Sequence, residues 1–321
     1  MKNLLPLLKR EFQEHRGGLL LTPFIAGAVL AVLLVLGLVT GASGLLKVQS
    51  TIGGEITRYA IQNNPELIAP AASKALQAFG LAAAAIINLT CAIVVFFYCL
   101  GSLYDDRKDR SILFWRSLPV SDAESVIAKV ITAALVAPAI AFVATVATQM
   151  LMWLCGAVVV LVTSGSLKGM LGGNFSFFSG TVQHLIALPI HVLWVLPVVG
   201  WLMLASAFAK TKPFLWAVLP PLGIAIADSW FDVTRNLSMP SNTVFRLIGE
   251  RLFDDPLPMA ANLSRDAVGL IGSLVPGAVA PGIFDEALVY LKMPSLWLGA
   301  LAGAAFIVFA IFLRRKSEEA Y

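Results

Sequence analysis

The hydrophobic positions of the chain are gathered into six long runs, separated by polar or mixed segments. The runs cover residues 19–41, 78–103, 129–163, 181–209, 214–232 and 296–313. About 20 consecutive apolar residues in a helix cross the roughly 30 Å hydrocarbon core of a bilayer. A helix also satisfies its backbone hydrogen bonds internally, which the bilayer interior requires. The pattern therefore predicts an all-α membrane protein with six transmembrane helices, built as a single domain of residues 1–321.

The first 18 residues show a shorter, amphipathic pattern. On a helical wheel the apolar side chains are Leu4, Leu5, Leu7, Leu8 and Phe12, and Lys9, Arg10, Gln13 and Glu14 lie mostly opposite. This arrangement is typical of a helix that lies in the membrane interface. The sequence thus predicts an N-terminal amphipathic interfacial helix over residues 1–18. A basic tail without fixed structure is the alternative.

Composition supports the membrane assignment and adds an orientation. The chain is 58% hydrophobic and only 13% charged, against about 25% charged residues in an average soluble domain. Lys and Arg favour the cytoplasmic side of a membrane protein. With the N-terminus inside, 14 of the 23 Lys and Arg residues fall in the four short inner segments. We therefore expect both termini to be cytoplasmic, in a multi-pass protein of the inner (plasma) membrane. The modest net charge of +4 gives no sign of a nucleic-acid partner.

The long outer segment, residues 233–295, contains one ambiguous stretch. Residues 267–283 carry no charge but are interrupted by Gly and Pro. A seventh span there would place Arg314, Arg315 and Lys316 outside, against the charge bias. The sequence therefore predicts a re-entrant or interfacial stretch on the outer face.

The connection between the second and third runs, residues 104–120, is unusual for an inner loop. It holds a charge cluster, then an apolar cluster, then a helix-start signal. Ser121 and Glu124 have the spacing of a capping box, in which two side chains cap the first turn of a helix. Pro119 precedes them and favours the end of the preceding element. The third helix is therefore predicted to begin at Ser121.

A short helix over 109–118 would be apolar on two sides. Phe114, Trp115 and Leu118 share one face, and Ile112 and Leu113 lie on another. A helix that rests on lipid needs only one apolar side. Two such sides indicate contact with the membrane domain and with a second protein. A membrane-surface helix with Trp115 at the interface is the alternative.

This connection resembles that of the permease subunits of ABC-2-type ABC transporters. In that family an acidic residue, an apolar pair, Leu-Pro-hydrophobic-Ser and a later Lys follow one another after the second span. The matching positions here are Asp109, Ile112-Leu113, Ser117-Leu118-Pro119-Val120-Ser121 and Lys129. Arg110-Ser111 stands where the family has Gly-Thr, and Ser111 keeps the hydroxyl. The amphipathic N-terminal segment and the six-span topology with both ends inside extend the resemblance to the whole chain.

The resemblance implies a function and a set of partners. The chain would be the permease of an ATP-driven transporter, in that family usually an exporter, and would not be an enzyme itself. A separate ATP-binding subunit would bind ATP and Mg²⁺, so this chain would need no cofactor or metal. A second copy or a related permease would complete a dimer surrounded by membrane lipid. The coupling residues implied are Asp109, Arg110, Ser111, Ile112, Leu113, Phe114, Trp115 and Leu118.

Two other classes of function remain as alternatives. The chain has no G-x-x-x-x-G-K-S/T phosphate-binding loop, so an ATPase must come from another chain. A membrane-embedded enzyme is one alternative, but H-E-x-x-H is absent. A secondary transporter or channel is the other, with Asp228 the carboxylate that would lie inside a predicted span. The candidates for a translocation path are Asn88, Gln149, His184 and His191. Hydrogen bonding between helices accounts for these four equally well.

Overall fold

The computed structural model describes residues 4–42, 68–108, 121–164, 175–235, 243–253 and 285–318, and every regular element in them is helical. The helices of the first half are α1 (Leu4–Glu14), α2 (Thr22–Ala42), α4 (Ile68–Ser102), α5 (Tyr104–Lys108), α7 (Asp122–Ile131) and α8 (Ala137–Ser164). Those of the second half are α10 (Phe175–Phe208), α11 (Pro213–Arg235), α12 (Thr243–Phe253), α14 (Asp285–Lys292) and α15 (Pro294–Glu318). π-Helical turns at Gly17–Leu21 and Thr132–Val136 join α1 to α2 and α7 to α8.

Within these ranges, five helical stretches are long and apolar enough to cross a membrane. They are Gly17–Gly37, Phe79–Lys108, Asp122–Val158, His184–Phe208 and Pro294–Lys316. Each coincides with one of the runs that the sequence pattern singled out. The chain is therefore a helical, multi-pass membrane protein.

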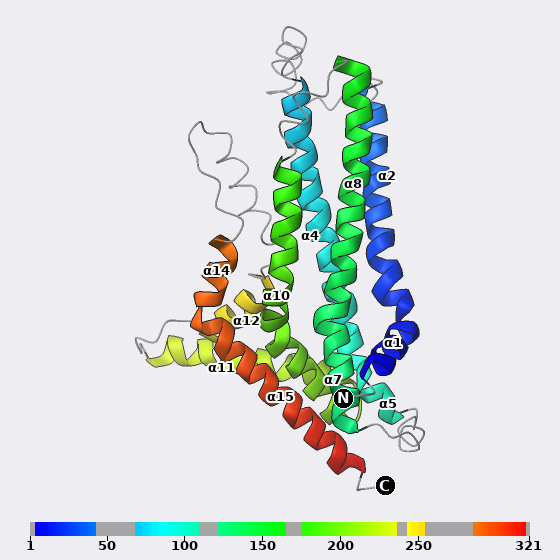
Figure 1. The fold of residues 1–321 in the computed structure, drawn as a ribbon. Helices are drawn as coiled ribbons and strands as arrows, with labels where there is room; N and C mark the ends of the chain where they lie inside the picture. Colours follow the sequence, from blue (N-terminus) through cyan, green and yellow to red (C-terminus); the bar gives the residue numbers. More distant parts are fainter. Residues whose placement is uncertain are drawn as a thin grey trace.

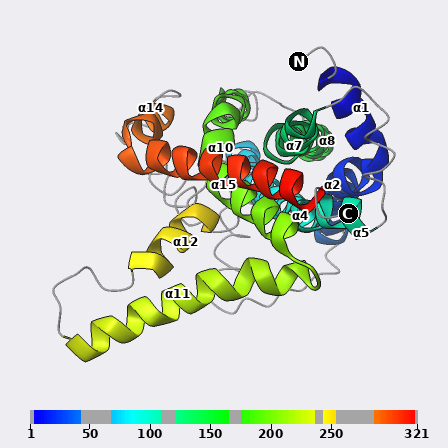
Figure 2. The same cartoon turned by 90° about the horizontal axis from the view of Figure 1, so that it is seen from below.

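The remaining predicted span, 214–232, corresponds to α11. Among the side chains that the structure describes, its apolar part is Pro213–Asp228, shorter than the about 20 residues that a perpendicular span needs. Figures 1 and 2 show α11 running across the long helices and away from them. Five of the six predicted spans thus match helices of spanning length. The sixth stays a prediction from the sequence.

The long helices stand side by side, and both ends of the chain lie at the same end of this bundle. In Figure 1, α2, α4, α8 and α10 rise together, while α15 descends obliquely beside α10. The N-terminus, the C-terminus, α1, α5 and α7 all gather at the lower end of that view. We call this the basal end. Having both termini at one end agrees with the predicted topology, and their cytoplasmic location remains an expectation.

The third long helix begins where the capping box predicted. Ser121 has extended backbone angles, and its hydroxyl accepts a hydrogen bond from the Glu124 N–H at 3.2 Å. The Glu124 carboxylate in turn accepts from the Ser121 N–H at 3.2 Å. The helix then continues through the π-helical turn Thr132–Val136, just before Pro138. Because proline disrupts the regular hydrogen-bond ladder, this local change lets α7 and α8 continue as one element.

Replacing Ser121 with Ala is expected to lower the free energy of unfolding by about 1 kcal/mol, because the Glu124 N–H loses the hydroxyl that accepts its hydrogen bond. Unfolding in mixed detergent–SDS micelles, followed by circular dichroism, measures the change. Glu124→Gln keeps a side-chain acceptor at the third helical position and should cost less. Equal losses for both variants would contradict the capping role of the hydroxyl.

Small side chains let the central helices approach closely. Ala133, Ala137, Ala141 and Ala144 form a fully buried stripe along the third helix, at helical spacing. Such stripes are typical of membrane helix interfaces, where association depends on close van der Waals packing. The hydrophobic core of the bundle lies between this stripe, α4 and α10.

Two glycines bring the backbones of α10 and α15 into close contact. A Cβ atom added to Gly303 would lie 2.5 Å from the Leu196 carbonyl carbon and 2.6 Å from the Pro197 nitrogen. A Cβ on Gly200 would lie 2.6 Å from the Gly303 carbonyl oxygen. These positions leave no room for a larger residue, because the obstacle is backbone. The glycine pair therefore fixes how α15 lies on α10.

Away from the basal end, α12 is fastened to the same two helices by one arginine. Arg251 donates hydrogen bonds to the backbone oxygens of Trp194 and Ser295, and its guanidinium lies 4.3 Å from the centre of the Trp194 ring. This side chain connects the predicted outer segment to α10 and α15. The stretch 267–283, predicted to be re-entrant or interfacial, lies outside the described residues.

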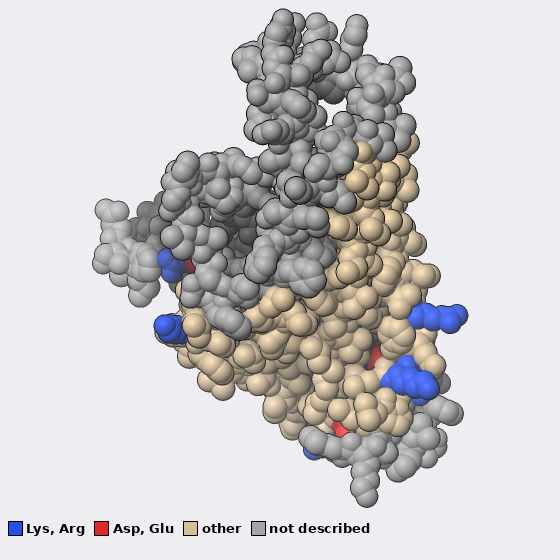
Figure 3. Space-filling view, turned by 45° about the horizontal axis from the view of Figure 1, so that its top comes forward, with Lys and Arg blue, Asp and Glu red and all other residues tan. Residues whose placement is uncertain are grey.

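The visible surface has the charge distribution expected of a bilayer protein. In Figure 3 the described surface over the long helices carries neither basic nor acidic side chains, and the charged groups stand at its margins. Many large apolar side chains of the long helices are exposed in the structure, among them Val32 and Leu33 of α2 and Leu298 and Leu301 of α15. Exposed apolar surface of this extent is typical of a protein that contacts lipid.

Candidate functional site

The structure does not describe the predicted coupling residues, but it describes the helices on either side of them. Asp109, Arg110, Ser111, Ile112, Leu113, Phe114, Trp115 and Leu118 all lie outside the described residues. Their coupling role therefore stays a prediction. The helices on either side, α5 and α7, are described, and both lie at the basal end. The candidate site is accordingly the set of contacts that holds the two ends of segment 109–120.

The N-terminal side of the segment is tied to the end of α10. The Ser206 hydroxyl accepts hydrogen bonds from the N–H groups of Leu103 and Tyr104, at 3.1 and 3.0 Å, and donates to the Leu100 carbonyl at 2.7 Å. Arg107 donates to the backbone oxygens of Ser206 and Ala209, at 2.6 and 2.9 Å. A cation at the C-terminal end of a helix is favoured by the helix dipole. These contacts fix the direction in which the chain leaves α4 and enters α5.

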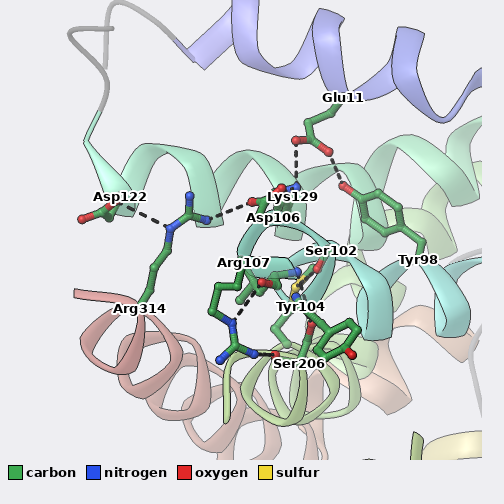
Figure 4. A network of polar contacts seen from close by, with 12 residues as sticks. Glu11, Tyr98, Ser102, Tyr104, Asp106, Arg107, Asp122, Lys129, Ser206 and Arg314 are labelled. Carbon is green, nitrogen blue, oxygen red and sulfur yellow. Dashed lines mark hydrogen bonds and ion pairs between the residues drawn. The ribbon is translucent and has the colours of Figure 1, made fainter. Parts of the chain in front are cut away.

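Lys129 is the first centre of a charge cluster that joins three parts of the chain. Its ammonium group lies 3.1 Å from a Glu11 carboxylate oxygen of α1 and 3.6 Å from a carboxylate oxygen of Asp106 in α5. Only 4% of Lys129 is exposed. The Tyr98 hydroxyl of α4 donates to the other Glu11 oxygen at 2.9 Å. Figure 4 shows these side chains converging between α1 and the third helix.

Arg314, near the end of α15, is the second centre. One terminal nitrogen donates to the same Asp106 oxygen at 3.3 Å, and its Nε lies 3.6 Å from a carboxylate oxygen of Asp122. The second distance is that of an ion pair rather than a hydrogen bond. Arg314 is 5% exposed, although it belongs to the last turns of the chain. Asp106 is thus shared by Lys129 and Arg314, and Figure 4 shows it between them.

We call Glu11, Asp106, Asp122, Lys129 and Arg314 the basal charge network. Its three carboxylates and two cations carry a formal charge of −1 when all five are ionised. Buried ions lose much of their hydration, and the loss is offset only while each keeps its opposite charge. The network therefore favours one arrangement of α1, α5, α7 and α15, and loss of either cation leaves carboxylates facing each other.

Sequence reasoning reached only part of this network. The sequence pointed to Lys129 because it matches a position of the family motif, and to Arg314 because it belongs to a basic cluster that indicates the inner side of the membrane. Asp106 was noted only as one charge of the cluster at 105–110, and Glu11 was not singled out, although Glu11 carried a signal. It follows Leu7 by four residues and so lies on the apolar side of α1, where the structure buries both. A carboxylate on the apolar stripe of an amphipathic helix indicates a buried partner of opposite charge.

The four candidates for a translocation path lie on three different helices. Asn88 of α4 and both His184 and His191 of α10 are buried within the chain. Gln149 of α8 is partly buried and donates to the Gly80 carbonyl of α4 at 3.2 Å. The His184 ring meets Phe142 edge-on, with centroids 5.0 Å apart. Gln149 thus bonds one helix to another, and a translocation role for the four residues stays a prediction.

Metal-binding residues do not cluster in the part of the chain that the structure describes. No group of three or more His, Cys, Asp or Glu side chains there could hold a metal ion. The basal charge network contains three carboxylates, but two cations lie among them, and their charge opposes a metal cation. The arrangement is suited to holding helices in register.

Comparison with protein-family models, with curated proteins and with solved structures gave no match to the chain.

Proposed function

We propose that this chain is the permease subunit of an ABC-2-type transporter, driven by a separate ATP-binding subunit that docks on segment 105–120. The proposal joins two independent supports. One is the sequence resemblance between Asp109 and Lys129. The other is the basal charge network, which holds both ends of that segment at the end of the bundle where the two termini lie.

The basal charge network is the observation that carries this proposal. A segment that only links two spans has no need of buried ions at its ends, because flexible connections are tolerated at little cost. A segment that transmits force needs rigid ends. Asp106 lies at the start of the segment and Asp122 just after its end, and the buried cations Lys129 and Arg314 hold them. Movement imposed on the segment would thus reach α1, α7 and α15.

The proposed subunit works as a dimer of permeases with two ATP-binding chains, and in the export direction. ATP and Mg²⁺ bind to the partner, because this chain has no phosphate-binding loop. Closure of the partner around ATP would push on the docked segment. Differential contact with the two states of the partner is what would shift the spans between their own states. The direction and the dimer come from the resemblance alone.

Substitution of Phe114 and Trp115 by Ala tests the docking surface. The tagged permease is co-expressed with a candidate ATPase that carries a phosphate-binding loop and purified in mild detergent. The unmodified chain should retain the ATPase, and the double variant should lose it while inserting normally in the membrane. Aromatic side chains are common anchors of protein interfaces, so the loss should be large.

Phe214→Ala with Trp216→Ala is the matched control. Both side chains are about half exposed on α11, outside segment 105–120. This variant should retain the ATPase. Equal retention by the Phe114/Trp115 variant and the unmodified chain would contradict docking on the segment. Failure of any ATPase with a phosphate-binding loop to co-purify with the unmodified chain would contradict the transporter function itself.

A further inference from the structure

The C-terminal helix contacts both sides of segment 109–120 through one side chain. Asp106 precedes the segment and Asp122 follows it, and the Arg314 guanidinium reaches both carboxylates, at 3.3 and 3.6 Å. Figure 4 shows Arg314 rising from α15 between the two aspartates. The two ends of the segment are therefore joined by a residue that lies almost 200 positions later in the chain.

Arg314 differs sharply from the residues beside it. Arg315 and Lys316 are exposed, whereas Arg314 is almost completely buried. A cation that serves only to orient the chain in the membrane can remain in water, as these two neighbours do. Burial of a guanidinium is costly unless carboxylates accompany it. The position of Arg314 thus depends on Asp106 and Asp122, and the converse holds as well.

The chemistry of the side chain suits a bridge. A guanidinium presents five N–H donors in a planar fork and can address two carboxylates with different nitrogens. Here a terminal nitrogen faces Asp106 and Nε faces Asp122. A lysine ammonium is a single point of charge at the end of a flexible stem. Lysine at this position could approach one aspartate well but would hold the pair less firmly.

We propose that Arg314 is a positioning residue that closes the base of segment 109–120 and couples its two ends to the last transmembrane helix. Through the Gly200–Gly303 contact, α15 is in turn fixed on α10. Displacement of the segment therefore moves α15 and α10 with it. The role of Arg314 in ATPase coupling rests on the proposed function, whereas its role in holding the two ends does not.

The distance between the two ends can be measured directly in the full-length chain. Spin labels are attached at Lys108→Cys and Ala123→Cys, and their separation is recorded by pulsed electron paramagnetic resonance. Cys155 is replaced by Ala in all variants, since it is partly exposed, whereas Cys91 and Cys99 are buried. The unmodified Arg314 should give one narrow distance distribution.

Arg314→Gln should broaden that distribution and move it to longer distances. Arg315→Gln removes the same formal charge from the exposed neighbour and should leave the distribution unchanged. Arg314→Lys should give an intermediate width. If Arg314→Gln does not yield a folded protein, the distance distribution is measured on Arg314→Lys instead. A distribution in the Arg314→Lys or the Arg314→Gln variant identical to that of the unmodified chain would overturn the proposal.

Asp122→Asn provides a second measurement through the partner of Arg314. It should broaden the distribution by itself, and adding Arg314→Gln should then change little, because the shared contact is already lost. Fully additive broadening would contradict a contact between the two residues. This comparison separates the bridge from a general loosening of the fold.

The functional consequence is measured with the co-purified ATPase. Arg314→Gln should retain the ATPase while lowering the rate of ATP hydrolysis of the co-purified complex several-fold, and Arg315→Gln should retain both the ATPase and that rate. Absence of an ATPase partner would contradict the proposed function but leave the label distances as evidence for the bridge. Unchanged label distances would contradict the bridge whatever the ATPase does.

Discussion

Replacement of Lys129 with Met is expected to destabilise the folded chain by about 3–5 kcal/mol, the cost typical of breaking a buried ion pair from one side. The ammonium group lies within 4 Å of both Glu11 and Asp106, and 4% of the residue is exposed. Methionine fills similar space but leaves two carboxylates without that cation. Unfolding in mixed detergent–SDS micelles, followed by circular dichroism, measures the loss.

A second substitution identifies the cause of that loss. Glu11→Leu in the Lys129→Met background removes one of the uncompensated carboxylates, and Asp106 still has Arg314. The double variant should recover part of the lost stability, since an apolar pair of similar volume can replace a buried ion pair at little cost. Lys9→Met, on the exposed face of α1, should have almost no effect. Equal stability of Lys129→Met and Lys9→Met would contradict the basal charge network.

The helices were largely predictable because the signals that form them are local. Run length and hydropathy located five helices of spanning length, and the spacing of Ser121 and Glu124 located the start of the third. Each of these signals acts within a few turns of the chain. The predicted amphipathic N-terminal helix is present as α1, over Leu4–Glu14, with Leu7 buried and Leu5 exposed. Its place in the membrane interface stays a prediction.

The basal charge network was not predictable in the same way because it depends on which distant helices meet. Asp106 and Arg314 are separated by 208 positions, and no local pattern pairs them. The sequence offered two adjacent arginines, and only packing decides that Arg314 faces inward while Arg315 remains exposed. The course of α11 shows the same limit, because apolar composition gives the length of a helix but not its direction.

The network and the glycine contact act on the same helix from two positions. Arg314 holds the basal end of α15 to the flanks of segment 109–120, and Gly303 fixes α15 on α10 about three turns earlier along the helix. A helix held at two points moves as one rigid body, because its backbone hydrogen bonds resist bending. Under the proposed function, loss of either point would uncouple the segment from α10.

Replacement of Gly303 with Ala is accordingly expected to cost about 3 kcal/mol, at the upper end of the range for overpacking substitutions. Even one methyl group would lie 2.5–2.6 Å from backbone atoms of Leu196 and Pro197. A flexible side chain could move aside, but the backbone of a packed helix cannot move without separating α10 from α15. The expected result is a lower unfolding midpoint in SDS titration and increased protease cleavage near α15.

Gly37→Ala is the matched control for this prediction. Gly37 lies in α2, and a Cβ atom added there meets nothing within 4 Å. Alanine has the higher helix propensity, by about 1 kcal/mol, so this variant should be as stable as the unmodified chain or slightly more stable. If Gly303→Ala lowers the stability and Gly37→Ala does not, the α10–α15 contact is the cause of the loss, because the chemical change is the same. A Gly303→Ala variant as stable as Gly37→Ala would show that the two helices can separate freely, and α15 could not then transmit movement from Arg314 to α10.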